Sequence, residues 1–284
     1  MSQLPLQFAE RCQRWRAGRE SYRPKGEVID PRQFEVAPLD EKPAKAYVIA
    51  NHYSGTFPAA RWRFGLFRAG VLVGVAVFSH PTNDRTLTNV FGGQASESTE
   101  LGRFVLDQDV KGNGETWFLA RCFEQLRSEG LRGVVSFSDP MPRRSVVSGD
   151  LVTPGHVGTI YQAFNGIYLG RSTPDYLRLL DSGQILSKRT LQKIRAKERG
   201  WEYAVRQLVA AGATQPGPDL RAWLAQELPR VSKAVRHHGN HRFAWGFSKG
   251  SRRDLERLHD ALPGHLLAYP KQPDPEPSVT RRAA

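Results

Sequence analysis

The sequence has few cysteines, no long apolar segment and no visible secretory signal. Cys12 and Cys122 are too few for a disulfide framework, which favours a reducing cytoplasm. The longest apolar run covers residues 71–78, whereas roughly 20 residues are needed to span a bilayer. The N-terminus lacks a basic segment followed by an apolar one. We therefore expect a cytoplasmic protein without membrane association, whose 284 residues can bury a core without disulfides.

Acidic residues are scarce relative to basic ones. The chain has 41 Lys or Arg and 28 Asp or Glu, a formal net charge of +13. From residue 184 onward there are 19 Lys or Arg against nine Asp or Glu, so most of the excess lies in the last third. Such a surplus is typical of a protein with a polyanionic partner, most simply nucleic acid.

An irregular arm over residues 1–42 and an α/β domain over residues 43–183 are predicted for the first part of the chain. Prolines interrupt the arm, whereas two β-prone runs on either side of Ala69-Gly70 indicate an antiparallel hairpin over residues 61–79. We expect a mixed sheet flanked by helices. The other predicted elements of the domain are a helix over 44–50, a strand over 100–106, an amphipathic helix over 116–128 and a strand over 133–137.

Residues 184–271 are predicted to form a basic, mainly helical extension, followed by a disordered tail over residues 272–284. Ser187 is a good N-cap, and Leu191 and Ile194 lie on one apolar stripe of the helix that follows. Further helices are expected over 201–211 and 219–227, and a strand–helix–strand unit over 240–270. The other face of the first helix is basic and carries Lys188, Arg189, Lys193, Arg195, Lys197 and Arg199.

A glycine-containing loop over residues 107–115 precedes the predicted helix 116–128. Gly112 and Gly114 can leave backbone N–H groups facing an anion at the helix N-terminus, as in acyl-coenzyme A N-acetyltransferases. Those proteins usually have Arg or Gln three residues before the first glycine, where this chain has Asp109, and Lys111 can compensate in part. The loop is therefore either a cofactor-binding loop or a turn that merely needs two glycines.

Polar residues cluster at 51–55, where the sequence is NHYSG, and on the strand 100–106. His52 can serve as a general base or proton shuttle, and Tyr53 as a hydrogen-bond donor or a ring that stacks on a base; the alternative is a helix C-cap with a satisfied histidine. Glu100 and Arg103 are three residues apart, which predicts opposite faces of the strand and a structural ion partner for each.

Two further polar groups lie beyond the strand 133–137. Asp139 follows the strand and is either a carboxylate that points into a cleft or an Asx-type turn before proline. Residues 156–165, which begin at His156, surround a short predicted helix rich in hydrogen-bonding groups. We expect no metal site at the histidines near 237–241, because the Gly-Asn pair at 239–240 breaks any helix that would align them.

Together, four segments resemble the phage Mom family of DNA-modification proteins, over roughly residues 44–271. They are NHYSG at 51–55, ELGRFVL at 100–106 with its Gly-loop helix, GTIYQAFN at 158–165, and GNHRFAW near 239 followed by AYPK at 268–271. The resemblance implies an N-acetyltransferase-like (GNAT) fold. It also implies an enzyme that adds a carbamoylmethyl group to the exocyclic N6 of adenine in phage DNA, which blocks host restriction enzymes.

The resemblance also implies site residues and partners. Double-stranded DNA is the expected partner, bound through its phosphates and a flipped adenine. The sequence does not identify the donor; the resemblance makes acetyl-coenzyme A or a related compound a candidate, and it makes iron a candidate cofactor. The candidate catalytic residues are His52, Tyr53, Arg103, Asp139 and Tyr161, and the candidate cofactor-binding residues are Lys111, Gly112 and Gly114. The candidate DNA-binding residues are Lys188, Arg189, Lys193, Arg195, Arg242 and Lys271.

Specific roles follow for an enzyme that acts on adenine N6. Asp139 is expected to accept a hydrogen bond from the amine, His52 to relay its proton, and Arg103 to orient the donor. Tyr53 or Tyr161 is expected to stack on the flipped base. Two other functions stay open at this point: an acyl-coenzyme A N-acetyltransferase that acts on a protein or small amine, and a DNA-binding protein without catalytic activity on the same fold.

Overall fold

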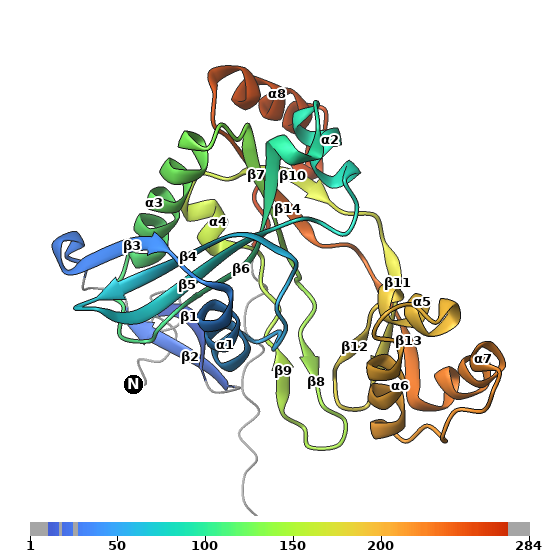
Figure 1. Cartoon of the computed structure of the whole chain (residues 1–284). Coiled ribbons are helices and arrows are strands. Elements are labelled where there is room, and N and C mark those ends of the chain that lie inside the picture. The colour runs from blue at the N-terminus through green and yellow to red at the C-terminus, as the bar shows by residue number, and fades with distance from the viewer. Residues whose placement is uncertain (1–10, 17–18, 25–27, 272–284) are drawn as a thin grey trace, which may run out of the picture.

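The computed structural model describes residues 11–16, 19–24 and 28–271. Its largest element is a seven-stranded mixed sheet (Figure 1), in which only the β6–β7 pair is parallel. In spatial order the strands are β10 (Ile167–Arg171), β14 (His241–Gly246), β7 (Gly133–Ser138), β6 (Ser98–Leu106), β5 (Val71–Ser79), β4 (Ala60–Arg68) and β3 (Phe34–Pro38). The fold-class prediction of a mixed sheet flanked by helices is confirmed.

Helices cover both faces of this sheet because its strands alternate buried side chains between two cores. On one face, α3 (Gly114–Ser128) and the short α4 (Thr159–Ala163) pack on side chains such as Phe243 of β14. On the other face, α1 (Glu41–Asn51) covers valines of β5, while α2 (Arg85–Phe91) and α8 (Lys249–Asp260) cover β7 and β14. In the described residues, no helix is long and apolar enough to cross a membrane.

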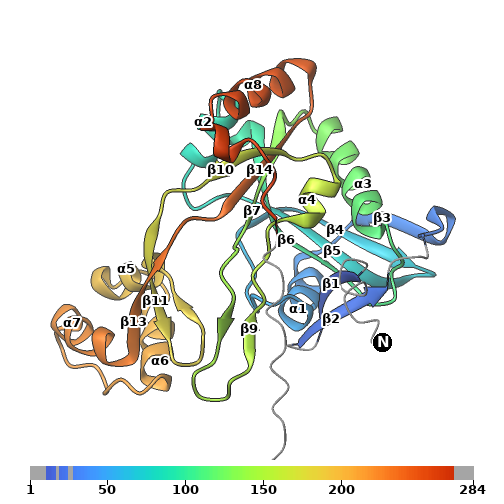
Figure 2. The same cartoon turned by 180° about the vertical axis from the view of Figure 1, so that it is seen from behind.

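A smaller unit is inserted between β10 and β14. It contains a three-stranded sheet of β12 (Ile185–Leu186), β11 (Asp175–Leu180) and β13 (Ser232–His237). The helices α5 (Lys188–Ala196), α6 (Trp201–Ala210) and α7 (Leu220–Val231) pack on it around a separate hydrophobic core. Figures 1 and 2 show this unit below the main sheet, joined to it by the chain segments on either side.

Several predicted elements agree with the structure. The hairpin turns at Ala69-Gly70, which both have positive φ angles of 49° and 77°. Ser187 caps α5 by accepting a hydrogen bond from the backbone N–H of Thr190 at 3.0 Å. The helices expected over 44–50, 116–128, 201–211 and 219–227 correspond to α1, α3, α6 and α7.

Other elements differ from the expected division of the chain. Residues 34–38, expected in an irregular arm, form the edge strand β3, and the described part of the arm also contains β1 (Arg11–Arg16) paired with β2 (Arg19–Pro24). The second unit includes β11, which precedes residue 184, so it is not purely helical. The chain then returns to the main sheet as β14. No strand forms over residues 267–270.

Candidate active site

The candidate site lies where β6 and β7 separate. The two strands pair only from Ser98–Gly133 to Leu101–Ser136, although β6 continues to residue 106. The register with β5 jumps from Val77–Arg103 to Phe78–Leu101, so Gly102 is an extra residue in β6. Such a bulge reverses the alternation of side chains. It places Glu100 and Arg103 on the same face, and the prediction of opposite faces was wrong.

Tyr53 and His156 form a half-buried pair at this opening. The Tyr53 hydroxyl lies 3.1 Å from Nε2 of His156, although the two residues are 103 positions apart in the sequence. Desolvation lowers the pKa of His156 to about 4, so its imidazole is neutral at pH 7. Burial raises the pKa of Tyr53. A neutral imidazole can therefore accept the hydroxyl proton of a tyrosine that keeps its proton at neutral pH.

His52 lies beside this pair but faces different partners. It is the C-cap of α1, and its ring centroid lies 4.2 Å from that of Tyr53. The backbone N–H of Ser54 donates to Nδ1 of His52 at 3.1 Å, and the Ser54 hydroxyl lies 2.8 Å from the same nitrogen. Nδ1 is thus an acceptor, and Nε2 carries the proton of a ring whose pKa burial lowers to about 3. His52 is therefore held as a donor, which does not suit the predicted role of proton acceptor.

Arg103 and Glu100 supply opposite charges on the shared face of β6. The Arg103 guanidinium donates to the Thr56 carbonyl at 3.0 Å and to the Thr56 hydroxyl at 2.7 Å. Desolvation lowers the pKa of Arg103, while Tyr53, Glu100 and Tyr161 oppose this effect. Burial raises the pKa of the Glu100 carboxyl against the attraction of Arg103. Within the described residues the Glu100 carboxylate has no hydrogen bond or ion pair.

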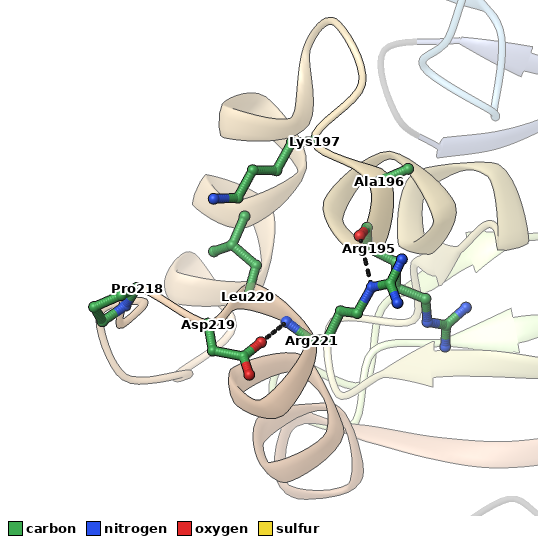
Figure 3. A pocket seen from close by; sticks show the side chains of 7 residues that line it. All are labelled: Arg195, Ala196, Lys197, Pro218, Asp219, Leu220 and Arg221. Atoms are coloured by element: carbon green, nitrogen blue, oxygen red, sulfur yellow. Dashed lines mark hydrogen bonds between the residues drawn. The ribbon is translucent and has the colours of Figure 1, made fainter.

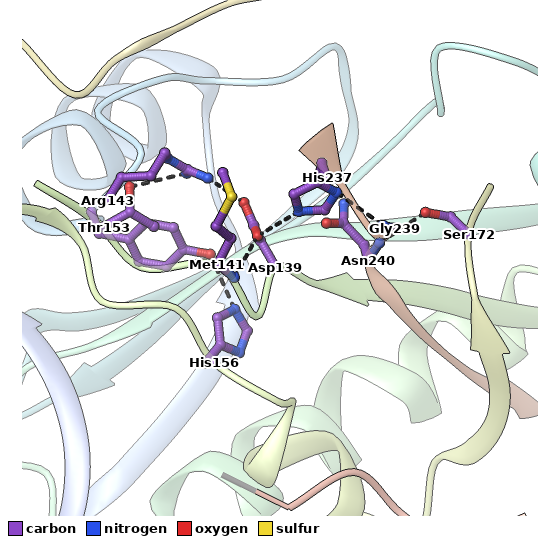
Figure 4. A network of polar contacts seen from close by, with 10 residues as sticks. Asp139, Met141, Arg143, Thr153, His156, Ser172, His237, Gly239 and Asn240 are labelled. Carbon is purple, nitrogen blue, oxygen red and sulfur yellow. Dashed lines mark hydrogen bonds and ion pairs between the residues drawn. The ribbon is translucent and has the colours of Figure 1, made fainter. Parts of the chain in front are cut away.

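Asp139 is the centre of a network that joins the two units (Figure 4). Its Oδ1 accepts from the Met141 backbone N–H at 2.9 Å and from Nε2 of His237 at 3.0 Å, and its Oδ2 accepts from Arg143 at 2.5 Å. Desolvation raises the pKa of Asp139, but the Arg143 and His237 hydrogen bonds outweigh it and lower the pKa. The Met141 contact is the predicted Asx-type turn. The carboxylate is a fixed acceptor whose lone pairs are largely used.

Tyr161 lies deeper than the other candidates. Its ring packs on Phe243 and Trp245, with centroid distances of 5.5 and 5.8 Å, and it is 9% exposed. Burial raises the pKa of Tyr161, while a hydrogen bond to Ser136 lowers it. The structure therefore brings His52, Tyr53, Arg103, Asp139 and Tyr161 to one region, but it leaves no open face on the Tyr161 ring for a base.

The glycine loop is closed by the N-terminal arm. Arg14 of β1 donates to the carbonyl oxygens of Asp107 and Gln108, and its guanidinium also lies 2.8 Å from the Glu115 carboxylate. The Gly112 carbonyl accepts from the backbone N–H of Ile29 at 2.9 Å. The arm thus packs against the loop and the first turn of α3.

The two glycines also differ from a pyrophosphate cradle. Gly114 is buried, and a Cβ there would lie 2.5 Å from the Val110 side chain, so the residue serves close packing. Lys111 is exposed, and so is Asp109, an acid where a phosphate would lie. The loop residues therefore do not fit coenzyme A as a pyrophosphate-binding loop would.

The histidines near residue 240 have structural partners. Nδ1 of His237 accepts from the Gly239 backbone N–H at 3.1 Å, and Nδ1 of His241 lies 2.8 Å from the Tyr168 hydroxyl. Throughout the described residues, no three His, Cys, Asp or Glu side chains are grouped to hold a metal ion. The structure therefore gives no support to the iron expected from the family resemblance.

The predicted DNA-binding residues fall into two groups. Arg242 is half-buried and donates two hydrogen bonds to the Leu169 carbonyl, and desolvation lowers its pKa. Its guanidinium therefore stabilises the fold and is not presented to DNA. The predicted DNA-binding residues of α5, together with Lys271, lie on the surface. Two of them form ion pairs there, Lys188 with Asp175 at 2.6 Å and Arg189 with Glu198 at 2.5 Å.

Arg195 of α5 lines an open pocket of about 520 Å³ between α5 and α7 (Figure 3). Its other charged lining residues are Lys197, Arg221 and Asp219, and Asp219 caps α7. The pocket belongs to the second unit and lies away from Tyr53 and Asp139.

Sequence reasoning missed several residues of the site. His156 was noticed only as the neighbour of a short helix, and Arg143 and His237 carried no signal, because each is placed by pairing between distant segments. The backbone N–H of His156 donates to the Asp139 carbonyl at 2.8 Å. Glycines at 155 and 158, with φ angles of 68° and 76°, bracket His156 and are the local signal that was available.

Three solved structures are similar to parts of the chain, each at 12% identity. An IAA acetyltransferase from Bacillus cereus ATCC 14579 has a TM-score of 0.28 and covers 54% of this chain and 92% of its own. An N-acetyltransferase from Staphylococcus aureus Mu50 has a TM-score of 0.31, with 50% and 87% covered. A tandem GNAT protein from the clavulanic acid biosynthesis pathway has a TM-score of 0.36, with 75% and 97% covered. Similarity at this level carries no argument about activity.

Sequence comparison with protein families gives a clearer result. The model of the Mom protein family matches residues 33–263. This range includes β3, the whole opening between β6 and β7, and the inserted second unit. No curated protein sequence matches the chain significantly.

Proposed function

The chain belongs to the Mom protein family, and we propose from this that it is a transferase that modifies DNA. The proposed reaction adds a carbamoylmethyl-type group to the exocyclic N6 of adenine in phage DNA and so protects the DNA from host restriction. The observation that carries the proposal is the match over residues 33–263, which includes the half-buried polar cluster between β6 and β7.

The central chemical requirement is the removal of a proton from a weakly nucleophilic amine. The lone pair of adenine N6 is delocalised into the ring, so the amine must lose a proton as the new bond forms. Tyr53 and His156 are suited to this step. When the Tyr53 hydroxyl donates to Nε2 of His156, the phenolic oxygen keeps a lone pair that can accept the N6 proton. As N6 bonds to the transferred group and the donor's leaving group departs, the Tyr53 oxygen accepts the N6 proton while its own proton passes to Nε2 of His156, in place of the relay through His52 expected from the sequence.

The other residues of the cluster have supporting roles in this proposal. The Nε2–H of His52 and the guanidinium of Arg103 offer donors to the transferred group or to the base edge. Asp139 holds Arg143 and His237 and so fixes the walls of the site. The Tyr161 ring is only 9% exposed and packs on Phe243 and Trp245, so it is not assigned the stacking role that the sequence suggested.

DNA is expected to bind mainly through its phosphates. The exposed cations of α5 and the +13 charge of the chain favour the backbone of a double helix. An acyl-coenzyme A acetyltransferase is the weaker alternative, because Asp109 stands where a phosphate would lie and Gly114 serves close packing against Val110. We therefore expect a donor that is bound without this loop.

Mass spectrometry of nucleosides tests the proposal directly. Plasmid DNA from cells that express the chain should contain a modified adenine, and the Tyr53→Phe variant should lose at least nine-tenths of it. The variant removes one hydroxyl and keeps the ring, so the free energy of unfolding should change by less than about 2 kcal/mol.

Tyr203→Phe is the matched control, because this tyrosine is 62% exposed on α6. It should leave the modification unchanged. The proposed reaction would be contradicted if plasmid DNA stayed unmodified in phage-infected cells that contain soluble wild-type protein. Full modification by Tyr53→Phe would contradict the role of the hydroxyl alone.

A further inference from the structure

A short hairpin projects from the candidate site. It consists of β8 (Arg143–Arg144) and β9 (Leu151–Thr153), and the chain enters it just after Asp139 and leaves it just before His156. Its base is fixed by the Asp139–Arg143 ion pair and by a hydrogen bond of 3.1 Å from Arg143 to the Thr153 hydroxyl. The hairpin is therefore a rigid extension of the same residues that form the wall of the site.

The tip of this hairpin presents two adjacent valines to solvent. Val146 is 69% exposed and Val147 is 82% exposed, the highest values for large hydrophobic residues in the described part of the chain. Turn tips are ordinarily built from Gly, Asn, Asp, Ser or Pro, and the turn itself does not require valine. Exposed apolar side chains placed together often mark a contact surface.

The backbone of the tip is well held, so its exposure does not come from a loose loop. The Ser145 and Asp150 backbones are hydrogen-bonded at 2.9 Å, as are Gly149 and Ser145. The Val146 backbone N–H donates to the Asp181 carbonyl of the second unit at 2.7 Å. The tip is thereby held by hydrogen bonds within the hairpin and by one to the second unit, beside which it lies in Figures 1 and 2.

The charges around the tip favour a polyanionic occupant on balance. Arg144 is exposed at the base of the tip, and the adjoining unit carries six Lys or Arg within residues 188–199, four of them on α5. Asp150 is exposed at the tip, while the Asp181 carboxylate lies 3.9 Å from Lys233. The tip thus combines an apolar point with the adjacent cation Arg144, and the surplus of positive charge lies on the second unit that the tip contacts.

Double-helical DNA fits this combination. Enzymes that act on a base within a duplex extrude it, and proteins often insert an apolar side chain between base steps to unstack them. We propose that Val146 and Val147 insert into the DNA and occupy the space left by the target adenine. This inference rests on the proposed DNA-modifying function. Three residues separate Arg143 from Val146, roughly 10 Å of extended chain, so the wedge is carried by the wall of the site itself.

The test compares the Val146→Ser/Val147→Ser variant with Val71→Ser. Val71 is 63% exposed at the turn between β4 and β5, so it controls for the loss of an exposed valine elsewhere. Duplexes that carry 2-aminopurine at several adenine positions report unstacking through increased fluorescence. The wild type and Val71→Ser should raise the fluorescence, whereas the double variant should bind within twofold of wild-type affinity but lose the increase. Its modification of plasmid adenine should fall at least tenfold.

Other outcomes would overturn the wedge. If the double variant raises the fluorescence and modifies adenine as the wild type does, the wedge is wrong and the proposed function stands. If the wild type neither binds duplex DNA nor modifies it, both proposals fail together. If the double variant instead changes from a dimer to a monomer in size-exclusion chromatography and flips the base normally, the valines serve contact between two copies.

Discussion

The polar cluster at the β6–β7 opening and the basic face of α5 use charge in opposite ways. In the cluster, Asp139 and Arg143 have side chains only 20% and 10% exposed, and each group depends on a named partner. On α5, Lys188 is 75% exposed and pairs with a carboxylate that is 43% exposed. Buried charges are costly when unpaired, whereas exposed pairs contribute little and remain available to a partner. This difference supports the proposed roles of the first region in chemistry and of the second in contact with DNA.

The contrast between the two regions would fail if the ion pair of the cluster and the exposed ion pair of α5 contributed equally to stability. Asp139→Asn leaves Arg143 and His237 without their carboxylate, and we expect the free energy of unfolding to fall by about 3 kcal/mol. Asp175→Asn removes the exposed partner of Lys188 and should cost less than about 1 kcal/mol. Urea denaturation measures both. Equal losses in the free energy of unfolding would show that burial does not distinguish the ion pairs of the two regions.

A pH titration sharpens the contrast within the cluster. The folded pKa of His156 is about 4, below its ordinary value of 6.5. Between these two pH values the imidazole is mostly protonated in the unfolded chain and mostly neutral in the folded chain. Stability should therefore be lost as the pH falls below about 6.5, by roughly 2 kcal/mol at pH 5 from this residue. His156→Gln should remove this part of the slope of unfolding free energy against pH, which denaturation at pH 7 and pH 5 measures. His238→Gln, at an exposed position, should leave the slope unchanged.

The α5 face should show its effect in DNA binding and not in folding. Lys193→Ala/Arg195→Ala should weaken binding to duplex DNA roughly tenfold and lower the slope of log affinity against log salt by nearly 2, if both side chains contact phosphates. Lys249→Ala/Arg253→Ala on α8 is the matched control, because α8 lies on the opposite side of the main sheet from the second unit (Figure 1). Equal losses from both variants would mean that the α5 face has no special role.

The smallest expected effect concerns Glu100. Burial raises the pKa of this carboxyl, so its charged form destabilises the fold at neutral pH. Glu100→Gln should therefore increase the free energy of unfolding at pH 7, by less than about 1 kcal/mol, while modification falls if the charge serves the site. Glu124→Gln, which lies on α3 in an exposed pair with Arg121, should give no gain. A loss of stability in Glu100→Gln would indicate a needed ionic partner.

Local patterns were sufficient for the regular elements. The β-prone runs around Ala69-Gly70 predicted the β4–β5 hairpin, because turn chemistry and alternation act over a few residues. The apolar spacing of α3 and the cap at Ser187 were equally local. The ordered motifs were sufficient for the family, which the match over residues 33–263 confirms.

Irregular and long-range features could not be predicted in the same way. The face shared by Glu100 and Arg103 depends on one extra residue in β6, and strict alternation gives the opposite answer. The closing of the glycine loop depends on Arg14, which lies 101 residues from Glu115. The return of β14 to the main sheet was missed because strand neighbours depend on the whole topology.

The sequence by itself determined the hairpin β4–β5 and most of the helices, the excess of positive charge and the family to which the chain belongs. Only the tertiary structure decided which of the polar residues act together. It paired Tyr53 with His156 and closed Asp139 between Arg143 and His237. The physical reason is range: propensity and periodicity act between near neighbours, whereas desolvation and hydrogen bonding act between groups that folding alone brings together.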